Sequence, residues 1–226
     1  MNLLILGCGK TGSLVADLAR ERRHRVIAIA SAQNVDRSAL TAEKLRNIDM
    51  VIDFTTPSAV LGNIEACLDA KKSMVVGTTG WFRELESVRA AVEKAGIGFL
   101  HGSNFSVGVN LFLETVRVAA QACRHGYHGQ IFERHHEQKK DAPSGTAVVL
   151  QKIVKDACGA ELEITSFREG DVVGLHELVL DSPNDRIYLC HDSKSRVGYA
   201  RGAVLGAEWL GTKKGFFDFR DVWPEL

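Results

Sequence analysis

Short apolar runs alternate with helical patterns through the first hundred residues of the chain. The apolar runs predict strands at residues 3–6, 25–30, 50–53, 73–76 and 97–100. Between them, apolar positions recurring every three to four residues predict helices at 10–22, 58–70 and 82–94. Strands that alternate with helices form βαβ units, whose strands run parallel. The first half is therefore predicted to be an α/β domain with a parallel sheet.

The pattern changes after about residue 104. Helical patterns cover residues 107–123 and 146–158, and strand-like runs lie at 130–133, 163–168, 175–180 and 186–191. The turn at 181–185 contains Pro183 and Asn184 and predicts a hairpin between the last two runs. This part is predicted to be an α+β domain with a mostly antiparallel sheet. Periodicity leaves open whether the tail, a helical pattern at 202–210 and an apolar segment at 217–223, packs on the first domain.

Composition is that of an ordinary globular protein, with 45% apolar and 25% charged residues in 226. The formal net charge is zero, which argues against nucleic acid as the partner. No apolar run approaches the ~20 residues of a membrane span, and the start lacks a signal-peptide pattern. The five cysteines form no C-x-x-C pair, which favours reduced thiols in a cytoplasmic protein and disfavours a zinc site.

A glycine loop, Gly7-Cys8-Gly9-Lys10-Thr11-Gly12, follows the first predicted strand and opens the first predicted helix. The spacing G-x-G-x-x-G allows a tight turn and a close approach of the backbone to a pyrophosphate at the helix N-terminus. The loop therefore predicts a Rossmann-type dinucleotide site. A glycine turn without a ligand is the alternative.

The end of the second predicted strand bears on which dinucleotide binds. An acid there normally binds the adenosine ribose, but this chain has Ala30-Ser31-Ala32-Gln33-Asn34. Without an acid nothing repels a 2′-phosphate, so NADPH is expected to be accepted at least as well as NADH. Ser31, Gln33 and Arg37 are candidates to contact that region.

Two further loops follow predicted strands at the sheet edge where ligands collect in open α/β folds. They are Asp53-Phe54-Thr55-Thr56-Pro57 and Gly77-Thr78-Thr79-Gly80-Trp81. Their hydroxyls and small residues suit a nicotinamide–ribose pocket. Either loop alone is also ordinary turn chemistry.

A second chemical site is predicted at residues 133–147, ERHHEQKKDAPSGTA. His135 and His136 carry protons near neutral pH, and Lys139 and Lys140 supply positive charge. Residues 144–146, Ser-Gly-Thr, are typical of a helix N-terminus, where free backbone N–H groups bind anions. An acid, a cation and a carboxylate cradle in one segment suit the reduction of a small acidic substrate.

The same segment closely resembles the hallmark of the 4-hydroxy-tetrahydrodipicolinate reductase family, also called dihydrodipicolinate reductase. Other segments resemble the family's remaining motifs, in the same order and along nearly the whole chain. They are Asp53-Phe54-Thr55, Val76-Gly77-Thr78-Thr79-Gly80, Asn104-Phe105-Ser106-Val107-Gly108-Val109-Asn110, Ser195-Arg196 and Gly202-Ala203.

This resemblance implies reduction of 4-hydroxy-tetrahydrodipicolinate to tetrahydrodipicolinate by hydride transfer from NADH or NADPH, in lysine and diaminopimelate biosynthesis. It also implies a cytoplasmic homotetramer. The dinucleotide-binding domain would comprise residues 1–105 with 197–226, and the substrate-binding and tetramerisation domain residues 106–196.

The resemblance also implies roles for individual residues. His135 would be the general acid and Lys139 the second catalytic residue, while His136, Gly145 and Thr146 would bind the carboxylates of a small dicarboxylate; no metal is implied. Phe105 would lie beside the nicotinamide. The cofactor-binding residues would be Gly7, Gly9, Lys10, Thr11, Gly12, Ser31, Phe54, Thr55, Gly77, Thr78, Thr79, Asn104, Phe105 and Arg196. For Arg196 a purely structural role stays open, and Lys140 could share the role of Lys139.

The chain departs from the family pattern in two places near the cofactor loop. The loop is one residue shorter than usual, and Lys10 stands where arginine is common. Two other functions stay open: a related reductase or amine dehydrogenase with a different substrate, and a non-catalytic nucleotide sensor. The paired carboxylate cradle argues against the first, and the presence of both His135 and Lys139 argues against the second.

Overall fold

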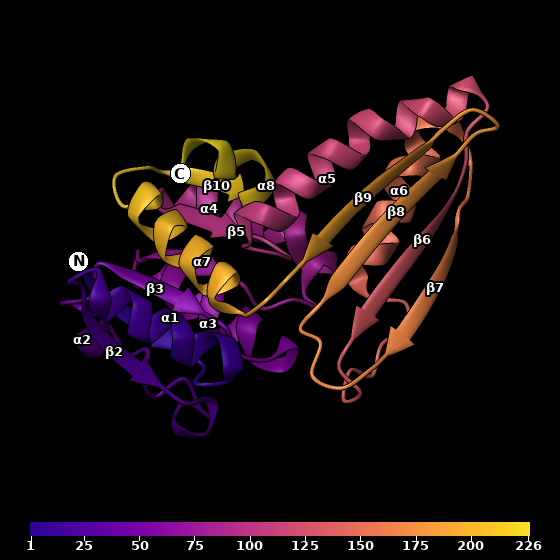
Figure 1. Ribbon diagram of the computed structural model, residues 1–226. Coiled ribbons are helices and arrows are strands. Elements are labelled where there is room, and N and C mark those ends of the chain that lie inside the picture. Colours follow the sequence, from indigo (N-terminus) through magenta and orange to yellow (C-terminus); the bar gives the residue numbers. More distant parts are fainter. The chain divides into compact units, whose positions relative to one another are not determined.

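The chain forms two compact units in the computed structural model, which describes residues 1–226. Unit 1 comprises Met1–Val107 and Arg196–Leu226, and unit 2 comprises Gly108–Ser195. Unit 2 is therefore inserted in sequence between two segments of unit 1. Figure 1 labels the helices and strands of each.

Unit 1 is built on a six-stranded sheet in the order β10-β5-β4-β3-β1-β2, with every neighbouring pair parallel. Its strands are β1 (Asn2–Leu6), β2 (Arg25–Ile29), β3 (Met50–Asp53), β4 (Ser73–Val76), β5 (Gly98–His101) and β10 (Gly215–Asp218). The first five lie within one residue of the predicted strands. The predicted α/β unit with a parallel sheet is confirmed.

Helices cover both faces of this sheet because successive strand residues point to opposite sides. Leu3 and Ile5 of β1 pack with α1 (Lys10–Glu21) and α7 (Val197–Leu210), which lie side by side in Figure 1. Leu4 and Leu6 pack in a second core with the other helices. These are α2 (Ala42–Leu45), α3 (Pro57–Asp69) and α4 (Leu85–Ala95), with the short 3₁₀ turns η1 (Ser31–Gln33) and η2 (Phe82–Glu84) between the elements.

The tail completes unit 1, a point that periodicity left open. α7 starts at Val197 rather than at residue 202, because Gly198 and Gly202 thin the apolar pattern without ending the helix. β10 then pairs with β5 at the sheet edge, followed by α8 (Phe219–Val222) and η4 (Trp223–Glu225). Phe219 and Val222 are buried in the same core as α1 and α7.

Unit 2 contains a four-stranded sheet in the order β7-β6-β8-β9. Its elements are α5 (Val107–Ala119), η3 (Ala120–His125), β6 (His128–His135), α6 (Gly145–Cys158), β7 (Glu163–Arg168), β8 (Leu175–Asp181) and β9 (Arg186–Asp192). β6 and β7 run parallel, whereas β6–β8 and β8–β9 are antiparallel. The expectation of a mostly antiparallel sheet is wrong, and the sheet is mixed. The reason is that α6 forms a crossover between β6 and β7, which returns the chain in the same direction.

One face of the unit 2 sheet packs against α6 (Figure 1). Ile131, Glu133 and His135 of β6 point to that face and are buried. β6 runs through His135, two residues beyond the predicted end at 133, so the chemistry-bearing segment begins inside a strand. None of the helices combines the length and the apolar character that crossing a lipid bilayer requires.

Candidate active site

A cavity of about 280 Å³ lies at the carboxyl ends of β1, β3 and β4 in unit 1. This is the edge of a parallel sheet at which ligands bind. Its lining comprises nine residues predicted individually from the sequence to bind cofactor, and Pro57, which was predicted only as part of the loop at 53–57. The nine are Gly9, Lys10, Thr11, Gly12, Phe54, Thr55, Gly77, Thr78 and Thr79.

The glycine loop has the close-packed geometry that its sequence requires. Gly7 has φ +92°, a region that side chains disfavour, and its N–H donates to the carbonyl of Ile29 at 2.8 Å. A Cβ on Gly12 would lie 1.8 Å from the carbonyl oxygen of Gly7, so only glycine lets α1 start this close to the turn. Gly9 caps α1 without a side chain, and a Cβ there would meet nothing within 4 Å. The first backbone N–H groups of α1 therefore fit a pyrophosphate.

The buried carboxylate of Asp53 holds the other two loops of the cavity in place. Its Oδ1 accepts hydrogen bonds from the Thr55 hydroxyl at 2.7 Å and the Thr78 hydroxyl at 2.6 Å. Its Oδ2 accepts from the Asn63 amide at 2.7 Å. The hydroxyls of Thr55 and Thr78 are thus engaged by Asp53. Their part in the cavity is to fix the loop backbone rather than to face a ligand.

Four other predicted cofactor residues are not part of the lining of this cavity, although the ring of Phe105 meets that of Phe54 edge to face. Ser31 begins η1 after β2. Asn104 accepts the backbone N–H of Ser106 at 2.9 Å, and Arg196 precedes the first residue of α7. Phe105 is 2% exposed and packs on Phe219, with ring centroids 4.6 Å apart. Phe105 is therefore part of the hydrophobic core of unit 1.

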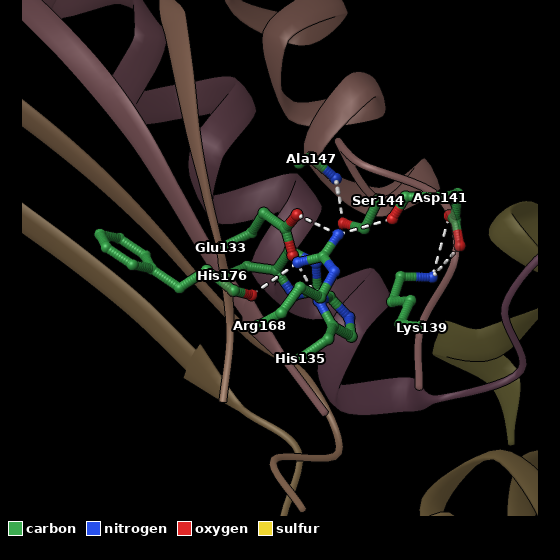
Figure 2. Close-up of polar contacts among 9 residues, drawn as sticks. Glu133, His135, Lys139, Asp141, Ser144, Ala147, Arg168 and His176 are labelled. Atoms are coloured by element: carbon green, nitrogen blue, oxygen red, sulfur yellow. Dashed lines mark hydrogen bonds and ion pairs between the residues drawn. The ribbon is translucent and has the colours of Figure 1, made fainter. Parts of the chain in front are cut away.

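A second polar cluster lies on the α6 face of the sheet in unit 2 (Figure 2). The cluster follows from strand register. Glu133 and His135 are two residues apart on β6 and therefore share one face. His176 of β8 is opposite Glu133, and Arg168 of β7 is opposite His135. The rings of His135 and His176 meet edge to face, with centroids 5.1 Å apart. Three strands thus bring four ionisable groups together beneath one helix.

His135 is held through one of its ring nitrogens. Its Nδ1 hydrogen-bonds the carboxylate of Glu133, and because a carboxylate only accepts, Nδ1 carries the proton. Nε2 is then the nitrogen that can gain and release a proton. Burial lowers the pKa of His135, the Glu133 carboxylate opposes that shift, and the charges of Lys139 and Arg168 add to it.

Lys139 lies in the loop after β6 and already binds a carboxylate there. Its ammonium donates to both oxygens of Asp141, at 2.8 and 2.9 Å, and this pairing lowers the pKa of Asp141. Lys140, by contrast, is exposed. Arg168 ties the loop to the cluster, since its Nη2 donates to Glu133 at 2.9 Å and to the carbonyl oxygen of Asp141 at 2.5 Å. The Ala142–Pro143 peptide bond in this loop is cis.

The N-terminus of α6 completes the cluster, as predicted from Ser144. The hydroxyl of Ser144 accepts the N–H of Ala147 at 3.3 Å and lies 3.0 Å from Nε2 of His176. Gly145, the first residue of α6, is exposed, and Thr146 is half-buried. Burial lowers the pKa of His176 to about 3, so this imidazole stays neutral. The backbone N–H of His136 donates to the carbonyl oxygen of Val172 at 2.7 Å, which anchors this residue.

Two members of this cluster, Arg168 and His176, were not predicted from the sequence, and Glu133 lay in the predicted segment without a role. Each lies in a predicted strand. The sequence pattern of those strands did not show whether a polar side chain points to the buried face or to solvent. The sequence of β6 did contain a signal for the pairing of Glu133 with His135. Extending the strand to His135 puts residues 133 and 135 on one face, and a glutamate beside a histidine on a buried face calls for a paired role.

Comparisons with known proteins show the family to which the chain belongs. The family domain described as "Dihydrodipicolinate reductase, N-terminus" matches residues 1–105, and "Dihydrodipicolinate reductase, C-terminus" matches residues 108–223. The 4-hydroxy-tetrahydrodipicolinate reductase of Christiangramia forsetii is 35% identical over 240 residues, covering 100% of this chain and 99% of its own. That of Laribacter hongkongensis is 38% identical over 200 residues, covering 79% of this chain and 74% of its own.

Solved structures share the fold. The dipicolinate-bound dihydrodipicolinate reductase from Paenisporosarcina sp. TG-14 has a TM-score of 0.78 at 20% identity, covering 98% of this chain and 99% of its own. An amine dehydrogenase from Mycobacterium smegmatis has a TM-score of 0.61 at 9% identity, covering 98% of this chain and 95% of its own. Because the two matched family domains together span nearly the whole chain, it belongs to the dihydrodipicolinate reductase family, and the predicted reductase function is confirmed at that level.

Proposed function

We propose that the protein reduces 4-hydroxy-tetrahydrodipicolinate to tetrahydrodipicolinate with NADPH or NADH, with His135 as the proton donor and Lys139 as the carboxylate-binding cation. The observation that carries the proposal is the unit 2 cluster. Hydrogen bonds through Glu133, Arg168 and Asp141 connect the imidazole of His135 to the ammonium of Lys139. The N-terminus of α6 adjoins them through Ser144 and His176, whose ring contacts that of His135. A proton-carrying imidazole, an ammonium and a helix N-terminus are the groups that reduction of an unsaturated dicarboxylate requires.

His135 supplies the proton in this proposal. Addition of a hydride to a conjugated imine leaves negative charge on the substrate, and an imidazolium can quench it near neutral pH. The protonated Nε2 is the donor, because Nδ1 is engaged by Glu133. Burial alone lowers the pKa of His135. The two negative charges of a bound dicarboxylate would favour the imidazolium, so the substrate itself promotes loading of the proton.

The substrate carboxylates would be held by Lys139 and by the N-terminus of α6. Lys139 shows that a carboxylate fits, since it holds both oxygens of Asp141, whose side chain is 59% exposed. An exposed ion pair is weak and readily exchanged. A substrate carboxylate would replace Asp141, while the backbone N–H groups of Gly145 and Thr146 would bind the other carboxylate together with the imidazole of His136.

The dinucleotide would bind in the glycine-loop cavity of unit 1. Its pyrophosphate fits the N–H groups at the start of α1, and Phe54 and Gly77 also line the cavity. When bound, a nicotinamide dinucleotide supplies the hydride. No acid follows β2, where Ser31–Gln33 forms a 3₁₀ turn in which the amide oxygen of Gln33 accepts the N–H of Ala30.

The expected outcome of a coupled assay is synthase-dependent oxidation of NADPH at least as efficient as that of NADH. A dihydrodipicolinate synthase would generate the unstable substrate from pyruvate and aspartate semialdehyde, and absorbance would be followed with each dinucleotide separately. A strong preference for NADH would contradict the cofactor proposal. No oxidation by folded protein that still binds a dinucleotide would contradict the proposed substrate.

We also propose that the protein is a cytoplasmic homotetramer that assembles through the face of the unit 2 sheet opposite α6. This face carries apolar side chains: Phe167 is 37% and Tyr188 is 55% exposed. On the same face, the guanidinium of Arg134 lies over the ring of Phe167, 4.6 Å from its centroid.

Light scattering is expected to give four times the 24.7 kDa chain mass. Phe167→Glu should lower the mass, because a charge would be buried in the interface. Val35→Glu, at a 77% exposed position of unit 1, is the matched control. A monomeric wild-type protein would refute the assembly.

A further inference from the structure

We propose that Glu133 is the positioning residue of His135: its buried carboxylate fixes which ring nitrogen delivers the proton and stabilises the protonated form of the ring. The consequence for catalysis rests on the proposed function. The effect on the imidazole itself does not, since it follows from the contacts of the free protein.

The position of Glu133 is set by the sheet. It lies two residues before His135 on the same face of β6, and it is 0% exposed. Its Oε2 accepts from Nδ1 of His135 and its Oε1 accepts from Nη2 of Arg168 at 2.9 Å (Figure 2). A carboxylate this deeply buried is costly unless both oxygens are paired. Here both are paired, one with the imidazole and one with a guanidinium.

Glu133 remains ionised in this setting. Burial on its own would raise the pKa of Glu133, but hydrogen bonds from Arg168, Ser166 and His135 lower it overall. Arg168 is well placed to do this because it belongs to β7, directly beside β6. The guanidinium of Arg168 is therefore held next to Glu133 by the pairing of two strands and not by a flexible loop.

The ionised carboxylate has two effects on His135. It accepts the Nδ1 proton, which leaves Nε2 as the only nitrogen able to exchange a proton with substrate. It also supplies the one negative charge among the groups that face His135. The others are Arg168 from β7 and Lys139 from the following loop, both of which lower the pKa of His135, and the neutral His176 from β8. Without Glu133, burial and two cations would all oppose the imidazolium.

The Nε2 side of the ring is kept clear by a small residue. A Cβ on Gly174 would lie 3.0 Å from Nε2 of His135 and 3.3 Å from its Cδ2. Glycine at 174 therefore leaves room on the side of the ring opposite Glu133. The carboxylate of Glu133 engages Nδ1, and the absence of a side chain at Gly174 leaves space beside Nε2. A general acid that donates its proton from Nε2 needs this arrangement.

The test compares Glu133→Gln with Glu133→Asp. Glutamine has nearly the same shape as glutamate and no charge, whereas aspartate keeps the charge and is shorter. A residue that only fills space would tolerate glutamine better than aspartate, and a residue that acts by charge would show the reverse. Glu163→Gln, at an exposed position of the neighbouring strand β7, is the matched control.

The first readout is the titration of His135 in the free protein, followed by NMR with ¹³C-labelled histidine. The chain has eight histidines, and loss of one signal in His135→Ala assigns the resonance. Glu133→Gln should shift the titration midpoint to lower pH by about one unit or more. Glu133→Asp should shift it less, and Glu163→Gln not at all.

The second readout is the pH profile of kcat/KM in the coupled assay. A general acid acts in its protonated form, so kcat/KM falls as pH rises through the pKa of the acid. In Glu133→Gln that fall should move to lower pH by the same amount as the NMR midpoint. An unchanged His135 titration in Glu133→Gln would overturn the inference. If that variant does not fold, the tautomer of neutral His135 is read from ¹⁵N chemical shifts of the wild type: the proton is expected on Nδ1, and a proton on Nε2 would overturn the inference. Absence of turnover in the wild type would instead overturn the proposed function and leave the NMR result standing.

Discussion

Replacing His135 with alanine is expected to lower kcat by about 10²- to 10⁴-fold, the usual contribution of a positioned general acid. The dissociation constant for NADPH should stay within about twofold of the wild-type value, since the cavity that would bind it is lined by residues of unit 1 alone. Stopped-flow turnover and fluorescence titration of the dinucleotide measure the two quantities separately.

His128→Ala is the matched control for this experiment. His128 belongs to the same strand, β6, and is exposed at its opposite end. It should leave kcat unchanged. Near-normal turnover in His135→Ala would refute the acid role, and an equal loss in both variants would point to disruption of β6 instead.

Replacing Lys139 with alanine is expected to lower kcat/KM by roughly 100-fold or more, with changes in both constants. KM should rise roughly 10- to 100-fold, because a charged hydrogen bond to a substrate carboxylate is lost. Turnover should fall as well, since the same ammonium stabilises charge that develops in the transition state. Initial rates over a range of substrate concentrations separate the two effects.

Lys140→Ala provides the control, because Lys140 is adjacent and exposed. Its kinetics should match the wild type. If Lys140→Ala were the impaired variant and Lys139→Ala were normal, the cation would have been assigned to the wrong lysine. Unchanged KM and turnover in Lys139→Ala alone would remove Lys139 from the site.

The central strands of the unit 1 sheet were predictable because they are buried on both faces. β3 and β5 are buried at every position and therefore read as continuous apolar runs. β10 was not predicted as a strand, since Gly215–Asp218 is a short edge strand that is half-buried throughout. In unit 2 the strands themselves were predicted, and so was the antiparallel hairpin of β8 and β9. The parallel pairing of β6 with β7 was not predicted, because apolar periodicity carries no information on whether the chain returns parallel or antiparallel.

The candidate site divides in a similar way. The lining of the cofactor cavity was largely predictable, since a glycine loop and two strand ends are local signals. The partners of His135 were not, because they depend on register between strands: Arg168 is opposite His135, and His176 is opposite Glu133. Asp53 was noted only as part of a loop. Its bond to Thr78 depends on the fold, which brings together residues 25 positions apart, whereas Thr55 is only two positions away.

Transfer of a hydride from the dinucleotide to the dicarboxylate can be followed with deuterium. The coupled reaction would be run with NADPH deuterated at both positions of nicotinamide C4, and the product examined by mass spectrometry. We expect a product that carries one deuterium in a carbon-bound position, formed only when the synthase is present. A product without deuterium, formed while NADPH is consumed, would contradict this transfer.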